Sequence, residues 1–189
     1  MEILLASNNK NKHKELLKIF QEAGSKHTLK VNKDIPDVIE DKNTIEENAK
    51  KKAEECYEVF KSPIISDDSG LFVDALGGQP GVHSKRYAGL SSTDVENNQK
   101  LIDELKTADN LSAFFKTVLC FFDGFNFITS EGVLNGNIIF EPRGKNGFGY
   151  DPIFEVSGRT LAEMTLDEKS NISHRKLAAL KLVEKLNEI

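Results

Sequence analysis

Residues 63–71 of this 189-residue chain read Pro63-Ile64-Ile65-Ser66-Asp67-Asp68-Ser69-Gly70-Leu71. The apolar run predicts a short buried strand that ends at the Asp-Asp-Ser-Gly segment. Open α/β sheets bind ligands at the carboxyl ends of their strands, so the two carboxylates are candidates for chemistry. Because side chains alternate along a strand, we expect Asp67 and Asp68 to point to opposite faces and only one to meet a substrate directly. The alternative is a solvated turn, since Asp, Ser and Gly are ordinary turn residues.

Composition limits the classes of protein that the sequence can encode. The chain is 39% hydrophobic and 29% charged, which is typical of a folded protein, and its length predicts a single domain over residues 1–189. A net charge of −5 argues against a general nucleic-acid partner. We find no secretion signal and no apolar window long enough for a membrane span. Cys56 and Cys120 form no metal-ligand spacing or disulfide framework, so we expect core thiols in a cytoplasmic protein.

The amino-terminal segment combines a strand, a polar turn and a helix. The strand is Ile3–Ala6, and the helix is predicted from about Asn11 to Ala23, with Leu16, Leu17 and Phe20 on its apolar face. N–H groups at a helix start attract phosphate, and lysines add positive charge here, although no P-loop pattern is present. The residues of the turn are Ser7, Asn8, Asn9, Lys10, Asn11 and Lys12. The alternative is a solvated basic helix start.

Two capping boxes predict two more helices. Thr44 with Glu47 opens a helix that runs to about Phe60, and Thr93 with Glu96 opens another. The second helix is expected to bury Val95, Leu101, Ile102 and Leu105. A strand is predicted at residues 28–31.

The second half of the chain predicts a hairpin and a final helix. Residues 113–122 and 125–128 flank Asp123-Gly124, a strong hairpin signal, and residues 132–140 are predicted to form a third strand. Phenylalanines 114, 115, 121, 122 and 125 are expected in the core, not on a base-stacking surface. Ser173 is predicted to cap the last helix, whose inward residues are expected to be Leu177, Leu180, Val183 and Leu186.

Residues 143–152 form a glycine-rich segment around two aromatics, Phe148 and Tyr150. Such glycines let the backbone and a ring approach a flat ligand closely, although a plain loop is the alternative. His174-Arg175 at a helix start can bind anions or donate hydrogen bonds to a base oxygen.

Three kinds of residue suit the parts of a nucleotide with a bound metal. There are carboxylates for a divalent cation and a Gly-flanked Phe148 with the His174-Arg175 donor pair for a base. The carboxylates are Glu40, Asp68 and also Asp67, and the cations for phosphates are Lys12, Lys52, Arg86 and Lys169. Together they predict metal-assisted hydrolysis of a nucleoside triphosphate.

The sequence also resembles the inosine/xanthosine triphosphate pyrophosphatases, the Ham1-like family, along nearly its whole length. Five ordered blocks carry the resemblance: Ser7-Asn8-Asn9 with Lys12 and Glu15; Glu40 with Thr44, Asn48-Ala49 and Lys52-Ala53; Ser66 to Leu71 with Gly77-Gly78, Pro80-Gly81 and Arg86 to Gly89; Gly147 to Pro152; and Lys169 with Ser173-His174-Arg175. No single block is specific, but five in this order are.

This resemblance implies an α/β fold with a long mixed twisted β-sheet flanked by helices, two lobes with the active-site cleft between them, and a homodimer. It implies hydrolysis of ITP, dITP and XTP to the monophosphate and pyrophosphate. Asp68 would be the general base and a metal ligand with Glu40, for Mg²⁺ or Mn²⁺. The phosphate and sugar residues would be Ser7 to Lys12, Lys52, Ser69 and Lys169, and the base residues would be Phe148, Gly149, Tyr150, Asp151, His174 and Arg175.

The chain departs from the family pattern in two places. Glu40-Asp41-Lys42 stands where Glu-Thr-Gly is common, and His83 stands where an aromatic residue is usual. The altered loop motivates a rival hypothesis, a nucleotide-binding regulatory module without hydrolysis. A third hypothesis keeps the chemistry but acts on other triphosphates, such as a modified pyrimidine.

Overall fold

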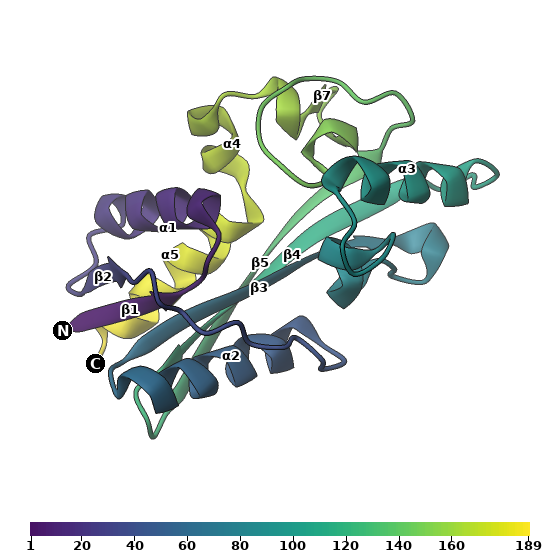
Figure 1. Ribbon diagram of the computed structural model, residues 1–189. Coiled ribbons are helices and arrows are strands. Elements are labelled where there is room, and N and C mark those ends of the chain that lie inside the picture. The colour runs from purple at the N-terminus through teal and green to yellow at the C-terminus, as the bar shows by residue number, and fades with distance from the viewer. The chain divides into compact units, whose positions relative to one another are not determined.

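The computed structural model describes residues 1–189 (Figure 1). Its five α-helices are α1 (Lys10–Glu22), α2 (Ile45–Phe60), α3 (Asp94–Leu105), α4 (Leu166–Ile172) and α5 (His174–Asn187). Its seven strands are β1 (Glu2–Ala6), β2 (Thr28–Val31), β3 (Ile64–Val73), β4 (Ser112–Phe122), β5 (Phe127–Ile138), β6 (Phe154–Val156) and β7 (Arg159–Thr160). Four 3₁₀ turns complete the elements: η1 (Asp74–Leu76), η2 (Gly81–Arg86), η3 (Asp151–Ile153) and η4 (Leu161–Glu163). No helix combines the length and the apolar character that crossing a bilayer requires.

The strands form one mixed sheet in the order β2-β1-β3-β4-β5-β6-β7. Strand β1 runs parallel to both β2 and β3, whereas β6 pairs antiparallel with β5 and with β7. The predicted α/β class with a long mixed sheet is therefore confirmed.

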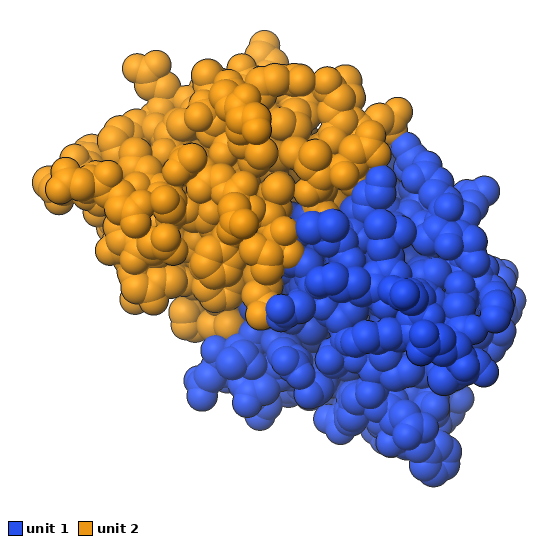
Figure 2. All heavy atoms as spheres, turned by 180° about the vertical axis from the view of Figure 1, so that it is seen from behind, with its two compact units in different colours: residues 1–68, 117–132, 174–189 blue, residues 69–116, 133–173 orange.

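The chain divides into two compact units (Figure 2). Unit 1 comprises residues 1–68, 117–132 and 174–189, and unit 2 comprises residues 69–116 and 133–173. The single-domain prediction stays a prediction. Strands β3, β4 and β5 each contribute residues to both units, and the division of β3 falls directly after Asp68.

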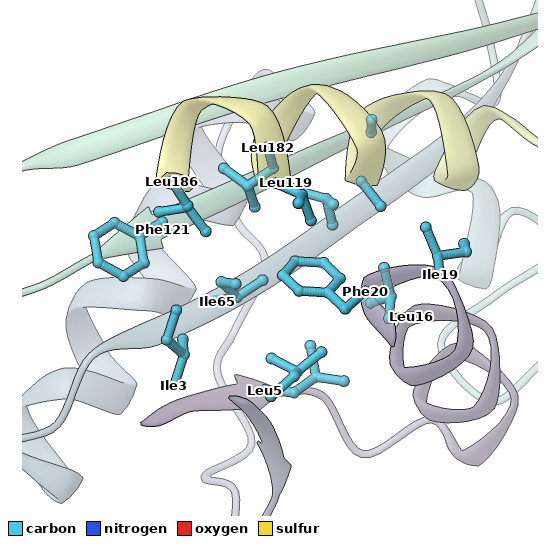
Figure 3. Close-up of a cluster of buried hydrophobic side chains, with 14 residues drawn as sticks. Ile3, Leu5, Leu16, Ile19, Phe20, Ile65, Leu119, Phe121, Leu182 and Leu186 are labelled. Carbon is cyan, nitrogen blue, oxygen red and sulfur yellow. The ribbon is translucent and has the colours of Figure 1, made fainter. Parts of the chain in front are cut away.

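Unit 1 has its own apolar core, drawn in Figure 3. Ile3 and Leu5 of β1, Leu16 and Phe20 of α1, and Leu182 of α5 belong to it. Helices α1 and α5 pack together on one face of β1 and β3, and α2 lies on the other face (Figure 1). Cys56 and Cys120 are buried free thiols, as predicted.

Unit 2 has a separate core. Leu71 and Val73 of β3 pack with α3, β6 and η4, whose buried members include Leu101, Phe154 and Leu161. The polar side chains of each unit are therefore supported by an apolar core of that unit.

Two strand boundaries in the prediction were wrong, and glycines explain both. Strand β3 does not end at the carboxylates but continues to Val73, because Gly70 lets the backbone of Gly81 approach: a Cβ on Gly70 would lie 2.5 Å from the Gly81 oxygen. Strand β5 is one strand, not two, since Gly132 sits inside it, where a Cβ would lie 2.0 Å from the carbonyl oxygen of His174. These glycines serve close packing and do not break the strands.

Several predicted core residues are exposed. Val95 is 76% exposed and Phe125 is 90% exposed, and Leu17, Leu177 and Leu180 also lie on the surface. In α5, Val183 and Leu186 are buried as predicted, but Ala178, Ala179 and Leu182 fill the positions that Leu177 and Leu180 were expected to take. Phe125 lies in the turn after β4, where its N–H donates to Asp123. Phe121 and Phe122 are buried as predicted.

Candidate active site

Strand β3 distributes its side chains to two helical layers of unit 1. Ile65 belongs to the core formed with α1 and α5, and Asp67, two residues on, lies toward the same helices. On the other face, Ser66 donates to the Ala49 carbonyl (2.5 Å), and Asp68 accepts from Asn48 of α2 (3.2 Å). The prediction that the two carboxylates point to opposite faces is therefore confirmed.

Asp67 is fully buried among cations. Its Oδ2 lies 2.6 Å from Lys12 Nζ and 4.0 Å from Arg175 Nε. Burial opposes ionisation, but the charges of Lys12, Lys52 and Arg175 outweigh it and hold the pKa of Asp67 below its ordinary value. Arg175 is itself buried and pairs with Glu15 of α1. Asp67 is thus an ionised anchor between α1 and α5.

Asp68 occupies the opposite electrostatic environment, although it is only 6% exposed. Burial and then the charge of Glu40 raise its pKa to about 6, against the lowering effect of Lys52 and Lys12. A carboxylate with a pKa near neutrality is a better proton acceptor than an ordinary aspartate and still ionises at physiological pH. This is the chemistry that a general base requires.

Lys52 connects the two carboxylate environments. It pairs with Glu40 and donates to the main-chain oxygen of Asp67 (2.9 Å). Burial opposes its charge, but Asp67, Glu40 and Asp68 together raise the pKa of Lys52, so it stays a cation.

The loop before α2 delivers Glu40 to this cluster without the glycine that the family pattern contains. The N–H of Lys42 donates to Asn48 Oδ1 (2.9 Å), and Lys51 bonds the Ile39 carbonyl (2.8 Å) and Asp41 (2.7 Å). Helix α2 therefore holds the loop from both sides of Glu40.

The polar turn before α1 forms as predicted, with Asn9 as the N-cap. Its side chain accepts from the N–H groups of Asn11 and Lys12, so two of the N–H groups expected to attract phosphate already have a protein partner. Ser7 Oγ accepts from the Asn9 N–H (3.2 Å), and Asn8 donates to the Ile35 carbonyl (3.2 Å). Lys10 is the first residue of the helix. The side chains of Ser7, Asn8 and Asn9 therefore hold the turn in place through hydrogen bonds to the protein backbone.

Unit 2 contains the glycine-rich segment, which is ordered around Asp151. Asp151 Oδ2 accepts from the Phe148 N–H (2.9 Å) and from buried Lys169 (2.6 Å), and Lys169 Nζ lies 4.7 Å from the centre of the Phe148 ring. Gly147 has φ +77°, and a Cβ there would collide with the Asp151 carboxylate. Phe148, Asp151 and Lys169 are thus linked by hydrogen bonds and a cation–π contact into one cluster.

The remaining predicted residues divide between the units. Tyr150 is buried in unit 2 and donates to the Ser84 carbonyl (2.8 Å), Arg86 ends η2, and Ser69 follows Asp68 in β3. His174 starts α5 in unit 1 and is buried. Ser173 is the C-cap of α4 and directly precedes α5, while its predicted capping of α5 stays a prediction. Helix α4 was missed from the sequence, although Thr165 and Glu168 form a capping box there.

Sequence reasoning also missed partners of the site. It gave no role to Asn48, which bonds Asp68, or to Glu15, which pairs with Arg175. The spacing of Asn48 and Lys52, one helical turn apart, was the available signal for the first, whereas nothing local linked Glu15 to a residue 160 positions away.

Glu40 and Asp68 are the candidate ligands for a metal ion. No group of three or more His, Cys, Asp or Glu side chains that could hold an ion is present. Glu40 and Asp68 lie close enough for the charge of Glu40 to raise the Asp68 pKa. Two carboxylates fit Mg²⁺, which uses one or two of them and completes its shell with water and phosphate oxygens.

Comparisons with known proteins identify the family of the chain. The Ham1 family model matches residues 3–185. A dITP/XTP pyrophosphatase of Caldanaerobacter subterraneus is 46% identical over 97% of this chain and 95% of its own. The structure of a HAM1 protein from Coxiella burnetii superposes with a TM-score of 0.91 at 39% identity, covering 100% of both chains. A structure from Mycobacterium abscessus, titled nucleoside-triphosphatase / dITP/XTP pyrophosphatase, has a TM-score of 0.78 at 37% identity, over 98% of this chain and 100% of that one. This chain belongs to the Ham1 family.

Proposed function

We infer that this chain is a nucleoside-triphosphate pyrophosphatase that hydrolyses ITP, dITP and XTP to the monophosphate and pyrophosphate. Relatives that it matches over nearly its full length are named dITP/XTP pyrophosphatases. The single structural observation that carries the inference is the placement of buried Asp68 on β3, where it accepts a hydrogen bond from Asn48 and lies near enough to Glu40 for that charge to raise its pKa. The reaction would remove deaminated purines from the nucleotide pool.

Asp68 acts as the general base in this proposal. Its carboxylate takes a proton from the attacking water as the water oxygen bonds phosphorus and the pyrophosphate leaves. The bond from Asn48 restricts the orientation of the carboxylate, so the accepting oxygen is held in place before substrate arrives.

Lysines stabilise the negative charge of the triphosphate and of the departing pyrophosphate. Lys12 and Lys52 are charged and fixed by Asp67 and Glu40 in unit 1. Lys169, fixed by Asp151, is the third predicted cation, and Ser69 and Arg86 are predicted contacts of the same end of the substrate.

We propose Mg²⁺ as the cofactor, held by Glu40 and Asp68, with Mn²⁺ as an alternative. When bound, the cation would reduce the charge of the phosphates and make phosphorus more electrophilic. The mutual repulsion of the two carboxylates supports this assignment, because a dication relieves it.

Base selectivity rests on hydrogen-bond complementarity. Hypoxanthine and xanthine present an acceptor oxygen at position 6, and the Arg175 guanidinium can only donate there. Adenine presents an amino donor instead, which leaves two donors facing each other. Glu15 fixes the guanidinium, and Phe148 supplies a ring against which a base can stack.

Product analysis tests this proposal. Purified protein with Mg²⁺ is given ITP, XTP, GTP or ATP, and pyrophosphate and free phosphate are assayed separately. Pyrophosphate from ITP and XTP, with little from ATP and GTP, is the expected result. Free phosphate as the primary product would overturn the reaction class, and pyrophosphate from all four would overturn the role of Arg175.

We further propose that the protein acts as a homodimer in the cytoplasm. Family resemblance supports the dimer, and the two free buried thiols are compatible with a reducing compartment. Light scattering coupled to gel filtration should give twice the 21.1 kDa chain mass, and a single-chain mass would refute the dimer.

A further inference from the structure

The geometry points to Asp94 and Asn98, on α3, as positioning residues for the loop that carries Phe148. This inference rests on the proposed function, since it concerns how the base end of the substrate is held. Neither residue belongs to the predicted site.

The two side chains bind both polar groups of Gly149. Asp94 Oδ2 accepts from the Gly149 N–H (2.7 Å), and Asn98 Nδ2 donates to the Gly149 carbonyl (3.1 Å). Residues four apart share one face of a helix, so α3 presents a donor and an acceptor together. Gly149 has φ +63°, a conformation with no intrinsic advantage for a free chain, and the two bonds select it.

Asn98 is poorly explained by stability alone. The side chain is buried, and its Oδ1 has no hydrogen-bond partner. Burying an unsatisfied acceptor is destabilising, whereas an apolar residue of similar shape would avoid this penalty. The neighbouring Asn97, by contrast, uses both ends of its amide, on the Ala88 N–H and the Lys85 carbonyl. The role of the Asn98 amide is therefore its hydrogen bond to the Gly149 carbonyl.

The loop is then held at two consecutive residues. Helix α3 fixes Gly149, and Asp151 fixes the Phe148 N–H. The Phe148 Cα lies between these backbone restraints, so releasing Gly149 should let the ring leave the position in which it stacks on a base. Binding would weaken, while the proton transfer at Asp68 would not change.

Kinetics of four variants test the inference. Asn98→Ala and Asp94→Ala each remove one bond, Asp94→Asn keeps an acceptor oxygen, and Asp103→Ala is the control. Asp103 lies on the same helix, where it pairs with Lys106 and Gln99 and not with the loop. For each protein we would measure kcat and KM for ITP with Mg²⁺, calorimetric Kd for IMP, and Tm.

We expect Asn98→Ala and Asp94→Ala to raise KM and the Kd for IMP about threefold to tenfold, as loss of one hydrogen bond predicts, with kcat within about twofold. Asp94→Asn should restore values near the wild type. KM and Kd matching those of Asp103→Ala, or kcat falling in step with Tm, would overturn the positioning role. A wild-type protein that neither hydrolyses ITP nor binds IMP would instead refute the proposed function.

Discussion

Asp67 and Asp68 are neighbours in one strand, and both are buried, yet the regions around them differ in charge. The region between α1 and α5 gives Asp67 two cations, Lys12 and Arg175, and with the charge of Lys52 from α2 they lower its pKa. The region facing α2 gives Asp68 another carboxylate, Glu40, and its pKa is raised to about 6. Burial alone thus does not determine protonation, because the surrounding charges decide the sign. One carboxylate becomes an anchor and the other a base.

The largest effect is expected from Asp68→Asn. Losing the general base should lower kcat for ITP by about 10²–10⁴-fold, since that is the usual contribution of such a group. Rapid assay of pyrophosphate release measures it, and circular dichroism should show an intact fold. A variant of near-normal rate would remove Asp68 from the mechanism.

Asp67→Asn should act mainly on stability. Removing the charge of Asp67 from a buried ionic cluster leaves Lys12 without its carboxylate partner, and we expect a loss of about 3–5 kcal/mol in the free energy of unfolding. Urea denaturation measures the change. The matched control is Asp103→Asn, which breaks an exposed pair with Lys106 and should leave the free energy of unfolding nearly unchanged. Equal losses in the two variants would contradict the anchor role.

In metal-free protein, Asp67 and Asp68 should contribute to the pH dependence of the free energy of unfolding with opposite signs. The pKa of Asp68 is about 6 when folded and 3.8 in its ordinary state, so the folded protein binds the extra proton between these values. Ionised Asp68 is therefore destabilising above pH 6. We expect Asp68→Asn to match the wild type below about pH 4 and to exceed it by about 2–3 kcal/mol above pH 6.

Ionised Asp67, by contrast, stabilises the folded protein. Its lowered pKa contributes stability above 3.8 that is lost as the pH falls through the folded value. Urea titrations in EDTA across this range would measure both effects. A stability difference between Asp68→Asn and wild type that does not change with pH would contradict the raised pKa.

Glu40→Gln should have the smallest effect and should make the Asp68 region more like an ordinary carboxylate site. Without the Glu40 charge, the pKa of Asp68 should fall, and the acid limb of the kcat profile should move to lower pH. The Mg²⁺ concentration for half-maximal activity should rise about threefold to tenfold, because one carboxylate ligand is lost. Glu54→Gln, on the exposed side of α2, is the control. An unchanged Mg²⁺ requirement would remove Glu40 from the metal site.

Local patterns predicted much of this architecture. Capping boxes at Thr44 and Thr93 placed two helix starts, and the pleat of β3 placed Asp67 and Asp68 on opposite faces. These features depend on residues a few positions apart, where periodicity and capping chemistry act.

Features that depend on distant residues were not predictable in this way. Gly70 and Gly132 resembled strand breakers, although each accommodates a segment that packs closely from elsewhere in the chain. The pairing of Glu15 with Arg175 and the contacts of α3 with Gly149 also join residues far apart in sequence. The raised pKa of Asp68 required knowing that Glu40 returns to β3.

The most direct test compares Asp67→Asn and Asp68→Asn in one experiment. For each, the free energy of unfolding in EDTA at pH 7.5 is paired with single-turnover pyrophosphate release from ITP with Mg²⁺ and excess protein. We predict that Asp67→Asn loses stability, whereas Asp68→Asn keeps or gains stability and releases almost no pyrophosphate within the wild-type reaction time. Full single-turnover activity in Asp68→Asn, or a stability loss there equal to that of Asp67→Asn, would contradict the division of roles between the two carboxylates.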